Sequence, residues 1–512
     1  MLRSTYAPTA QRLRRPTVTI LSGGDPWVHQ AKEFAEHRDD KCRALLWTMR
    51  TGKSKAVIDK AEHQFAQGNI EGVIVLAPNG IHLNWVLNEI PRWSWPFNEY
   101  MAFGWETPKR ADWDRIEGLM AFENYHDGIR YLTVNMEALS HLDCIKAIRR
   151  FRKSCHGKIM LVISEAHHFG RAGAKRTRLA RNLGKVAKFI TVETGTAILN
   201  SPLRAYSIYK ILDDLALGPE YAGDTYEKFA RHFAEWEIDP DAGPYRAKRR
   251  AYKKIKGYKN LDELRDKMAQ WSSVVTRDDV EGMPELLRTE RIVVMSEVQR
   301  RAYLEMVSRH LVEIEQGLVV TAADAGARVQ KLQQILNGYV KNGDDIIDID
   351  PDAPIYDALV DEIVGTYPEN SIVWCRYRED IRRVCKRLKF EGIPFLEMHG
   401  GVPTAKREDI RLQFQNSDRP VVLVGHPAVG GEGKDYSRAH AIIFFSSTPN
   451  AIHVSQGEER GTEKWGHPVT IVRIRTCGTV DDRNWALVDG KVSVADDLSG
   501  RGLRDLLMRT DV

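Results

Sequence analysis

The sequence contains few cysteines, no long apolar run and no repeat. Its six cysteines, at positions 42, 144, 155, 375, 385 and 477, include no Cys-x-x-Cys pair. This argues against a disulfide framework and a zinc site and suits a reducing cytoplasm. No segment approaches the roughly 18 uninterrupted apolar residues of a membrane helix, so we expect no membrane partner. The first 16 residues contain four arginines but no apolar segment, so we expect no secretion signal.

The length and the charge distribution favour several domains and an anionic partner. The 512 residues exceed what one hydrophobic core holds, so we expect two or three domains. The net charge is only +5, but residues 246–259 contain eight Lys or Arg among fourteen and no acid. A second basic cluster extends from Arg171 to Lys188. Such blocks can follow a phosphate backbone, although solvated helix faces would show the same composition.

A nucleotide-site candidate follows the first apolar run. The run ends at Trp47, a polar turn contains Gly52-Lys53-Ser54, and a helical pattern begins at once. This order indicates a strand, a phosphate loop and a helix, since a helix N-terminus offers unpaired N–H groups and a positive dipole end. The lysine would add a charge for the phosphates and the hydroxyl a ligand for Mg²⁺. A full motif would need glycine at position 47, so the alternative is an ordinary helix start that contains Lys and Ser.

Apolar segments alternate with helical patterns in the first half of the chain. Four such segments lie at 72–77, 131–135, 159–163 and 189–192. This alternation predicts an α/β fold with a doubly wound parallel sheet. The third segment leads directly into Ser164-Glu165, and α/β folds place catalytic groups at this carboxyl edge of a buried parallel strand.

The motifs follow one another in the order of a known family. Together they resemble the superfamily-two helicases, and among these the Swi/Snf-type ATPases in the compact form often carried by bacteriophages. The resemblance extends over roughly residues 25–485. Its elements are Gln30, 49–54, 77–80, 134–140, 164–167, 194–202, 371–378, 425–437 and 456–460.

This resemblance implies two RecA-like lobes, each a doubly wound parallel sheet, with a helical insertion between them. We also expect an acidic loop at 344–352 that faces away from DNA. The expected domains are lobe 1 at 1–202, a helical, basic insertion and linker at 203–285, lobe 2 at 286–485, and a C-terminal helix and tail at 486–512.

The resemblance also implies that ATP and Mg²⁺ bind between the lobes and that hydrolysis uses residues of both. Lys53 would neutralise phosphate charge, and Glu165 would orient and deprotonate the attacking water. Arg460 would act as an arginine finger with Gln456 beside it. The further implied contacts are Gln30, Thr51, Gly52, Ser54 and Lys55 to the nucleotide, Ser54, Ser164 and Glu165 to the metal, and His167, Thr194 and Thr196 for coupling to DNA. Capping or core hydrogen bonding is the alternative for each.

Three positions depart from the family pattern. Ser164 replaces the Walker B aspartate, and loss of such a metal partner typically costs about 10- to 100-fold in metal affinity or activity. Glu463 replaces the second motif VI arginine, and Ala197 replaces the motif III proline. Since the lysine, glutamate and finger arginine are retained, we expect a slowed ATPase whose rate Ser164→Asp raises.

The expected DNA contacts are to the backbone and independent of sequence, which makes binding steeply salt dependent. Trp85 could stack on a base, with a core tryptophan as the alternative. The residues expected to contact DNA are Asn79, Asn84, Asn135, Arg376, Gly430, Gly431, Arg249 and Lys253.

The leading hypothesis is an ATP-dependent DNA translocase or helicase that acts on duplex or branched DNA in repair or recombination. Duplex is favoured because the Swi/Snf branch mostly translocates on it without fully unwinding it. One alternative is a nucleotide-gated DNA-binding clamp with negligible turnover. Another is the motor subunit of a larger DNA-processing or defence assembly, with protein partners. RNA is an alternative substrate. The expected location is the cytoplasm, that of the host if a phage encodes the chain.

Overall fold

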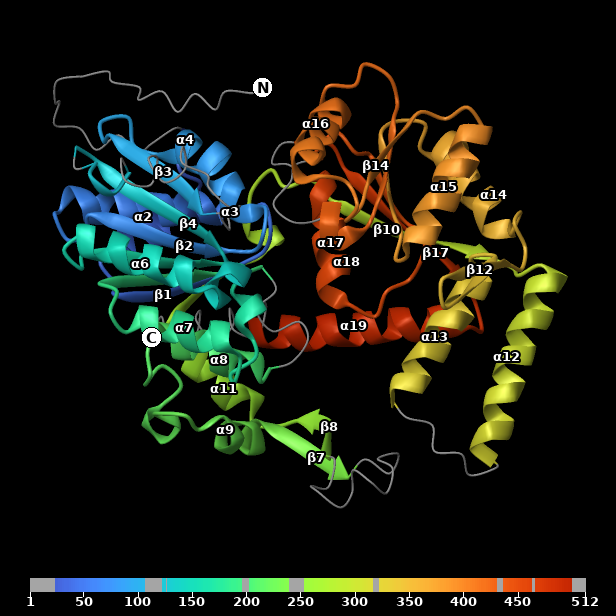
Figure 1. The fold of residues 1–512 in the computed structure, drawn as a ribbon, viewed down its shortest axis with the longest axis horizontal. Coiled ribbons are helices and arrows are strands. Elements are labelled where there is room, and N and C mark those ends of the chain that lie inside the picture. The colour runs from blue at the N-terminus through green and yellow to red at the C-terminus, as the bar shows by residue number, and fades with distance from the viewer. Residues whose placement is uncertain are drawn as a thin grey trace.

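A computed structural model describes residues 24–105, 122–125, 127–195, 202–238, 253–315, 322–430, 436–462 and 466–499. These residues form two α/β lobes that lie side by side (Figure 1). Among them, no helix combines the length and the apolar character needed to cross a membrane.

Lobe 1 is built on a seven-stranded sheet with the order β3-β4-β2-β5-β6-β1-β9, in which every neighbouring pair is parallel. All residues of β2 and β5 are buried, as expected for parallel strands covered on both faces. The strands are β1 (Cys42–Trp47), β2 (Gly72–Ala77), β3 (Tyr100–Trp105), β4 (Ile129–Asn135), β5 (Ile159–Ser164), β6 (Phe189–Glu193) and β9 (Ser272–Val275).

Helices cover both faces of this sheet, which makes it doubly wound. Val57 and Ile58 of α2 pack on one face together with Trp85, so the core alternative for this tryptophan is confirmed. Phe151 and Tyr209, from α6 and α8, pack on the other. The helices are α1 (Val28–His37), α2 (Lys53–Ala66), α3 (Ile81–Asn84), η1 (Trp85–Glu89), α4 (Ile90–Trp93), η2 (Met136–Ser140), α6 (Leu142–Ser154), η3 (Ala166–Phe169) and α7 (Lys175–Gly184).

The stretch that we expected to be a mostly helical insertion contains three strands. β9 lies beside β1 in the lobe 1 sheet, where its first and last residues, Ser272 and Val275, are buried. β7 and β8 form an antiparallel hairpin that projects from lobe 1 (Figure 1). The elements are α8 (Arg204–Leu212), η4 (Pro219–Tyr221), α9 (Tyr226–Phe233), β7 (Ala234–Ile238), β8 (Lys253–Tyr258), α11 (Leu261–Ala269) and η5 (Arg277–Asp279).

Lobe 2 has a six-stranded parallel sheet with the order β10-β17-β16-β13-β15-β14. The expected fold class, two doubly wound RecA-like lobes, is therefore confirmed. The strands are β10 (Leu286–Val293), β13 (Ser371–Trp374), β14 (Phe395–Met398), β15 (Val422–Gly425), β16 (Ala441–Phe444) and β17 (Val469–Thr476). Its helices are α14 (Pro354–Val360), η6 (Asp361–Thr366), α15 (Arg378–Phe390), α16 (Thr404–Gln415), α17 (Pro427–Gly430), α18 (Ala451–Glu458) and η7 (Glu459–Gly461).

Two helices and a hairpin extend lobe 2 on the side away from lobe 1 (Figure 1). The helices are α12 (Glu297–Glu315) and α13 (Ala322–Leu336). The acidic stretch at 344–352, expected to be a loop, instead contains β12 (Asp345–Asp348), which pairs with β11 (Tyr339–Asn342). β12 contains two adjacent isoleucines, Ile346 and Ile347, whose β-branched side chains favour a strand.

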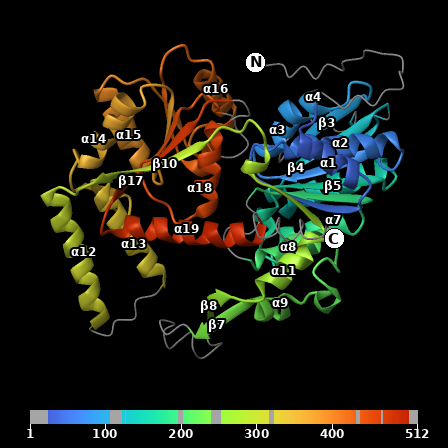
Figure 2. The same ribbon diagram turned by 180° about the vertical axis from the view of Figure 1, so that it is seen from behind.

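The last described helix, α19 (Val480–Ser499), links the two lobes. Trp485 and Val488 pack into the lobe 2 core at one end, and the helix contacts α11 of lobe 1 at the other. Both views show α19 running from lobe 2 to lobe 1 (Figure 1, Figure 2).

Candidate functional site

The turn after β1 has the geometry of a phosphate loop. Gly52 stands at the N-terminus of α2 with a φ of 77°, a left-handed conformation that favours glycine. A Cβ atom at Gly52 would overlap the side-chain nitrogen of Gln30. The loop therefore requires glycine here for two reasons, and the first turn of α2 directs its unpaired N–H groups outward.

Lys53 and Thr51 fix the shape of this loop. The Lys53 ammonium donates to the carbonyl oxygens of Trp47 and Thr48, each at 3.0 Å. The Thr51 hydroxyl donates to the same Thr48 oxygen at 2.7 Å. Ser54 is half-buried in the first turn of α2. The cation and the hydroxyl thus stand together at a helix N-terminus, a site that suits phosphate oxygens and Mg²⁺.

Helix α1 holds the loop from the other side. The Gln30 amide donates to the carbonyl oxygen of Gly52 at 2.9 Å and accepts from the backbone of Trp27 at 2.8 Å. A ring nitrogen of His29 lies 2.8 Å from the carbonyl oxygen of Thr51. Gln30 is 3% exposed, so it is part of the loop's support rather than a surface glutamine.

Lys55 lies elsewhere. Its ammonium forms a buried ion pair with Asp59, 2.8 Å away on the next turn of α2, and faces the ring of Trp93. Its side chain is thereby engaged in helix packing, and we no longer assign that side chain to the nucleotide.

Ser164 and Glu165 end β5 at the carboxyl edge of the sheet. Glu165 has a φ of 55°, unusual for a residue other than glycine, and strain of this kind often marks functional sites. One of its carboxylate oxygens lies 3.3 Å from Nδ1 of His167. The same nitrogen is 3.2 Å from the hydroxyl of Thr194 at the end of β6. The predicted coupling residues His167 and Thr194 are therefore in contact, whereas Thr196 lies outside the described residues.

The electrostatics keep Glu165 ionised. Burial by itself would raise the pKa of this carboxyl, but His167 and the charge of Lys53 outweigh burial and lower the pKa to about 2. An ionised carboxylate beside a phosphate loop can orient a water molecule for attack.

Motif VI, in lobe 2, contacts lobe 1 at the phosphate loop. The Arg460 side chain, 5% exposed, contacts the sulfur of Met49 in the phosphate loop at 3.9 Å. The guanidinium of Arg50 in turn donates to the backbone oxygen of Arg460 at 3.2 Å. Gln456 is 1% exposed, and both of its amide atoms are buried without a hydrogen-bond partner. Arg460 thus lies against the loop, and Gln456 has unused bonding capacity.

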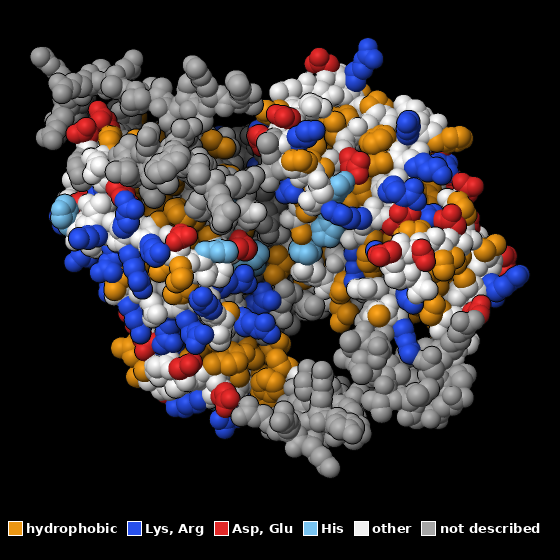
Figure 3. Space-filling view, in the orientation of Figure 1, with side chains coloured by type: hydrophobic (Ala, Val, Ile, Leu, Met, Phe, Trp, Pro, Cys, Tyr) orange, Lys and Arg blue, Asp and Glu red, His pale blue; other side chains and the backbone are white. Residues whose placement is uncertain are grey.

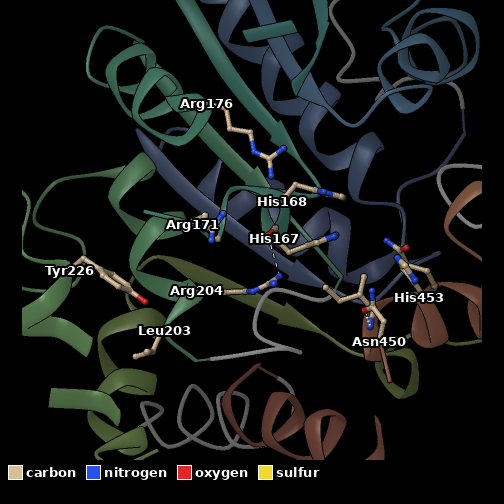
Figure 4. A pocket seen from close by; sticks show the side chains of 12 residues that line it. His167, His168, Arg171, Arg176, Leu203, Arg204, Tyr226, Asn450 and His453 are labelled. Carbon is tan, nitrogen blue, oxygen red and sulfur yellow. Dashed lines mark hydrogen bonds between the residues drawn. The ribbon is translucent and has the colours of Figure 1, made fainter. Parts of the chain in front are cut away.

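A cavity of about 480 Å³ lies between the lobes and is lined by residues of both (Figure 4). His167 and Arg204 face it from lobe 1, joined by a 3.5 Å contact from the Arg204 guanidinium to the His167 carbonyl oxygen. Asn450 and His453 face it from lobe 2. Its lining also includes His168, Arg171, Arg176, Leu203, Tyr226 and Gln456. Three arginines and three histidines give the cavity a basic lining suited to an anion.

The residues expected to contact DNA differ in exposure and in the hydrogen bonds that they make within the protein. Asn79 is exposed after β2, whereas Asn84 bonds to Asn88 and Glu89 on its own helix. The Asn135 side chain caps η2 by accepting from the backbone of Ala138 at 2.7 Å. Arg376 donates to Gln333 at 2.6 Å, and Gly430 ends α17. Gly431, Arg249 and the side chain of Lys253 lie outside what the structure describes.

Our sequence reasoning missed Glu193, the last residue of β6. It follows the apolar segment 189–192 in the sequence, is 2% exposed, and one of its oxygens, Oε2, has no hydrogen-bond partner. The signal that could have found it is a carboxylate at the carboxyl end of an otherwise apolar strand.

The residues present fit a nucleotide with Mg²⁺. Lys53 and Ser54 stand at the N-terminus of α2, and buried polar atoms of Gln456 and Glu193 have no hydrogen-bond partner. Within the described part of the chain, no group of three or more His, Cys, Asp or Glu is arranged to hold a metal ion. A Mg²⁺ here would depend on phosphate oxygens and water for most of its ligands, which is its usual mode in ATPases.

Two family models match this chain. The SNF2-related domain matches residues 41–342, and the helicase conserved C-terminal domain matches residues 355–461. The chain is similar to SWI/SNF-related matrix-associated actin-dependent regulator of chromatin subfamily A-like protein 1 of Xenopus tropicalis, with 20% identity over 341 residues, 65% of this chain and 33% of that protein. An uncharacterized ATP-dependent helicase of Schizosaccharomyces pombe is 28% identical over 153 residues, 29% of this chain and 14% of the relative.

Among solved structures, the chain is similar to the Sulfolobus solfataricus SWI2/SNF2 ATPase core in complex with dsDNA, with 17% identity, a TM-score of 0.38 and 94% coverage of both chains. The chain spans about a third of the length of the Xenopus relative. Because the SNF2-related match extends over more than half of the chain, this protein belongs to the SNF2-related domain family and carries a helicase C-terminal domain.

Proposed function

We propose that the protein is an ATP-dependent translocase that moves along duplex or branched DNA through contacts to the backbone. The observation that carries this proposal is the meeting of Lys53, Glu165 and Arg460 at one point between the lobes. The ammonium lies on the phosphate loop, and Arg460 touches the same loop from lobe 2. Hydrolysis that needs both lobes makes lobe closure part of the reaction cycle.

Each side chain has a defined role in this proposal. Lys53 and the N-terminus of α2 hold the β- and γ-phosphates of the substrate, and Glu165 orients the attacking water. Arg460 stabilises the charge that develops on the transferred phosphoryl group, and Gln456 directs its free amide toward the same group. Ser54 would hold Mg²⁺, which would neutralise phosphate charge there.

The basic surface of lobe 1 supports DNA as the partner. Lys and Arg side chains gather over α6 and α7 (Figure 3). The exposed members include Arg149, Arg152, Arg171, Arg178 and Lys185. The basic cavity between the lobes continues this surface inward from Arg171 and Arg176. Such an arrangement suits a phosphate backbone that is followed without regard to sequence.

Phosphate release measured with and without duplex DNA tests this proposal. The protein is incubated with ATP and Mg²⁺, and Lys53→Ala serves as the blank. We expect stimulation by duplex that the blank abolishes. Release that duplex leaves unchanged would contradict a DNA-dependent motor.

One observation favours a second candidate, a nucleotide-gated DNA clamp. Ser164 stands where the family has the Walker B aspartate, so the metal site lacks its usual carboxylate on β5. In a clamp, ATP binding closes the lobes on DNA without turnover. Tight binding of ATP and duplex with no phosphate release would favour the clamp over the motor.

A further inference from the structure

Glu193 stands beside the position of the missing carboxylate. In the lobe 1 sheet it is in register with Ser164 on β5 and with Leu45 on β1. It therefore lies between the strand that ends in Ser164 and the strand that leads to the phosphate loop.

The face of the sheet on which Glu193 lies follows from the same register. On β5, Met160 and Val162 belong to the core cluster packed against α2, so Ser164, two residues on, points to that face. Residues in register on neighbouring parallel strands share a face, so Glu193 also points toward α2. The N-terminus of α2 carries Lys53 and Ser54, the residues to which the proposed function assigns the phosphates and Mg²⁺.

The Glu193 carboxylate is poorly satisfied where it stands. It is 2% exposed, and Oε2 has no hydrogen-bond partner, an arrangement that costs free energy. Burial raises its pKa to about 7, although the charge of Lys53 and the Ser164 hydroxyl act in the opposite direction. The remainder of β6, Phe189 to Val192, is apolar except for Thr191. A core glutamate without a full set of partners, facing a phosphate loop, suits a cation that binds together with the substrate.

We propose that Glu193 takes the place of the Walker B aspartate and holds the hydrated Mg²⁺ of bound ATP from β6 instead of β5. This inference rests on the proposed function. The carboxylate that is missing at Ser164 on β5 is then replaced by the Glu193 carboxylate on the neighbouring strand β6, on the same face of the sheet. The Ser164 hydroxyl is left to orient the Glu193 carboxylate or a water of the metal shell.

The inference changes our expectation for Ser164→Asp. In the wild-type chain this substitution adds a second carboxylate to a site that already has one, so it raises the rate little. In a chain without the Glu193 carboxylate, the same substitution restores metal binding. If Glu193 only balanced the charge of Lys53, Ser164→Asp would not compensate for the loss of the Glu193 carboxylate.

The test measures how tightly the protein binds Mn²⁺, used in place of Mg²⁺, in the presence of ADP. The free Mn²⁺ is quantified by its paramagnetic resonance signal. We expect Glu193→Gln to weaken Mn²⁺ binding about 10- to 100-fold while ADP binding in EDTA stays within about two-fold. The double variant Ser164→Asp, Glu193→Gln should recover most of the Mn²⁺ affinity. Melting temperatures establish that each variant is folded.

Glu62→Gln is the matched control. Glu62 is also a buried glutamate of lobe 1, but its carboxylate accepts from Tyr131 at 2.9 Å and from Asn98 at 2.7 Å. Its substitution should leave Mn²⁺ affinity unchanged.

The outcomes separate this inference from the proposed function. Unchanged Mn²⁺ affinity in Glu193→Gln, or no recovery in the folded double variant, overturns the inference alone. Failure of the wild-type chain to bind ADP or ATP contradicts the proposed function and removes the inference with it.

Discussion

At the scale of single residues, the proposed chemistry depends on charged side chains whose electrostatic interactions are strengthened by burial. Arg460 and Glu165 are 5% and 9% exposed, so the electrostatic interactions of each are weakly screened by water. Arg460 comes from lobe 2 and Glu165 from lobe 1. The arrangement favours a reaction that proceeds only when both lobes are in place.

Replacing the finger arginine should affect turnover more than binding. We expect Arg460→Ala to lower the DNA-stimulated turnover rate roughly 10³-fold or more, since arginine fingers contribute roughly 10³ to 10⁵ in rate. ADP affinity should change only a few-fold. Arg300→Ala on the exposed surface of α12 is the control and should retain the wild-type rate. Equal rates in the two variants would contradict the role of Arg460.

The buried Glu62 should make stability depend on pH. Burial raises the pKa of this carboxyl from 4.5 to about 7, although Asn98 and Tyr131 favour the ionised form. Between these values the folded state retains a proton that the unfolded state releases, so stability falls as pH rises from 4.5 to about 7 and stays reduced above it.

We therefore expect Glu62→Gln to remove part of this fall. The melting temperature of the variant, relative to the wild type, should be higher at pH 8 than at pH 4.5. A comparison at two pH values cancels the constant effect of altered hydrogen bonds. An identical difference at both pH values would show that folding does not shift the pKa of Glu62.

The residues of the candidate site could be predicted from sequence where they belong to a motif. They could not be predicted where their place depends on packing in the folded chain. Lys53, Gln30 and Arg460 were found from motif order, and the structure places all three around one loop. Glu193 and the packing of Lys55 were not found, because both depend on neighbours distant in sequence. The sequence marks Glu193 only as a carboxylate after an apolar segment, whereas its burial beside Ser164 follows from the pairing of the strands.

At the scale of elements, the phosphate loop is a glycine turn held between α1 and α2. Two residues of the loop, Arg50 and Gly52, have left-handed backbone conformations. Hydrogen bonds by Gln30, Thr51 and Lys53 to loop carbonyls also hold its shape. Loss of the glycine should therefore displace the whole anion site.

Two glycines of lobe 1 offer a matched pair for this prediction. Gly52→Ala should abolish ADP binding, because the new Cβ overlaps Gln30 and the φ of 77° disfavours alanine. Gly68→Ala has a similar φ of 72° but meets no atom within 4 Å. It should lose only about 1–2 kcal/mol of stability and still bind ADP. Retained ADP binding in Gly52→Ala would refute the loop assignment.

The elements themselves were predictable to different degrees. Long apolar runs such as β2 and β5 are evident in sequence, since buried parallel strands are uniformly apolar. β8 and β12 were missed because charged residues surround a few apolar ones. β9 is four residues long, and its membership in the lobe 1 sheet depends on β1.

At the scale of the whole molecule, the two lobes are joined by α19 and by contacts around motif VI. Arg277, which follows the lobe 1 sheet, donates to Glu459 and to Thr462 of lobe 2, each at 3.2 Å. The phosphate loop thus contacts lobe 2 through Arg50 and Met49, and the segment after β9 contacts it through Arg277. The basic face over α6 and α7 lies on lobe 1 (Figure 3).

Neutralising part of this basic face should weaken DNA binding and its dependence on salt. We expect the double variant Arg178→Gln, Lys185→Gln to lower the slope of log affinity against log salt by up to about 2, since each phosphate contact contributes about 0.9. The loss should be the same for unrelated duplex sequences. The pair Arg300→Gln, Arg301→Gln on α12, also exposed, is the control. An unchanged slope in the α7 variant would place the DNA elsewhere.

The most direct test of the account is movement along duplex DNA. A third strand bound to one end of a duplex is displaced when a motor passes beneath it, and its release can be followed by fluorescence. We predict release that requires ATP and Mg²⁺ and is absent in Lys53→Ala. Hydrolysis of ATP on duplex DNA without release of the third strand would contradict a translocase.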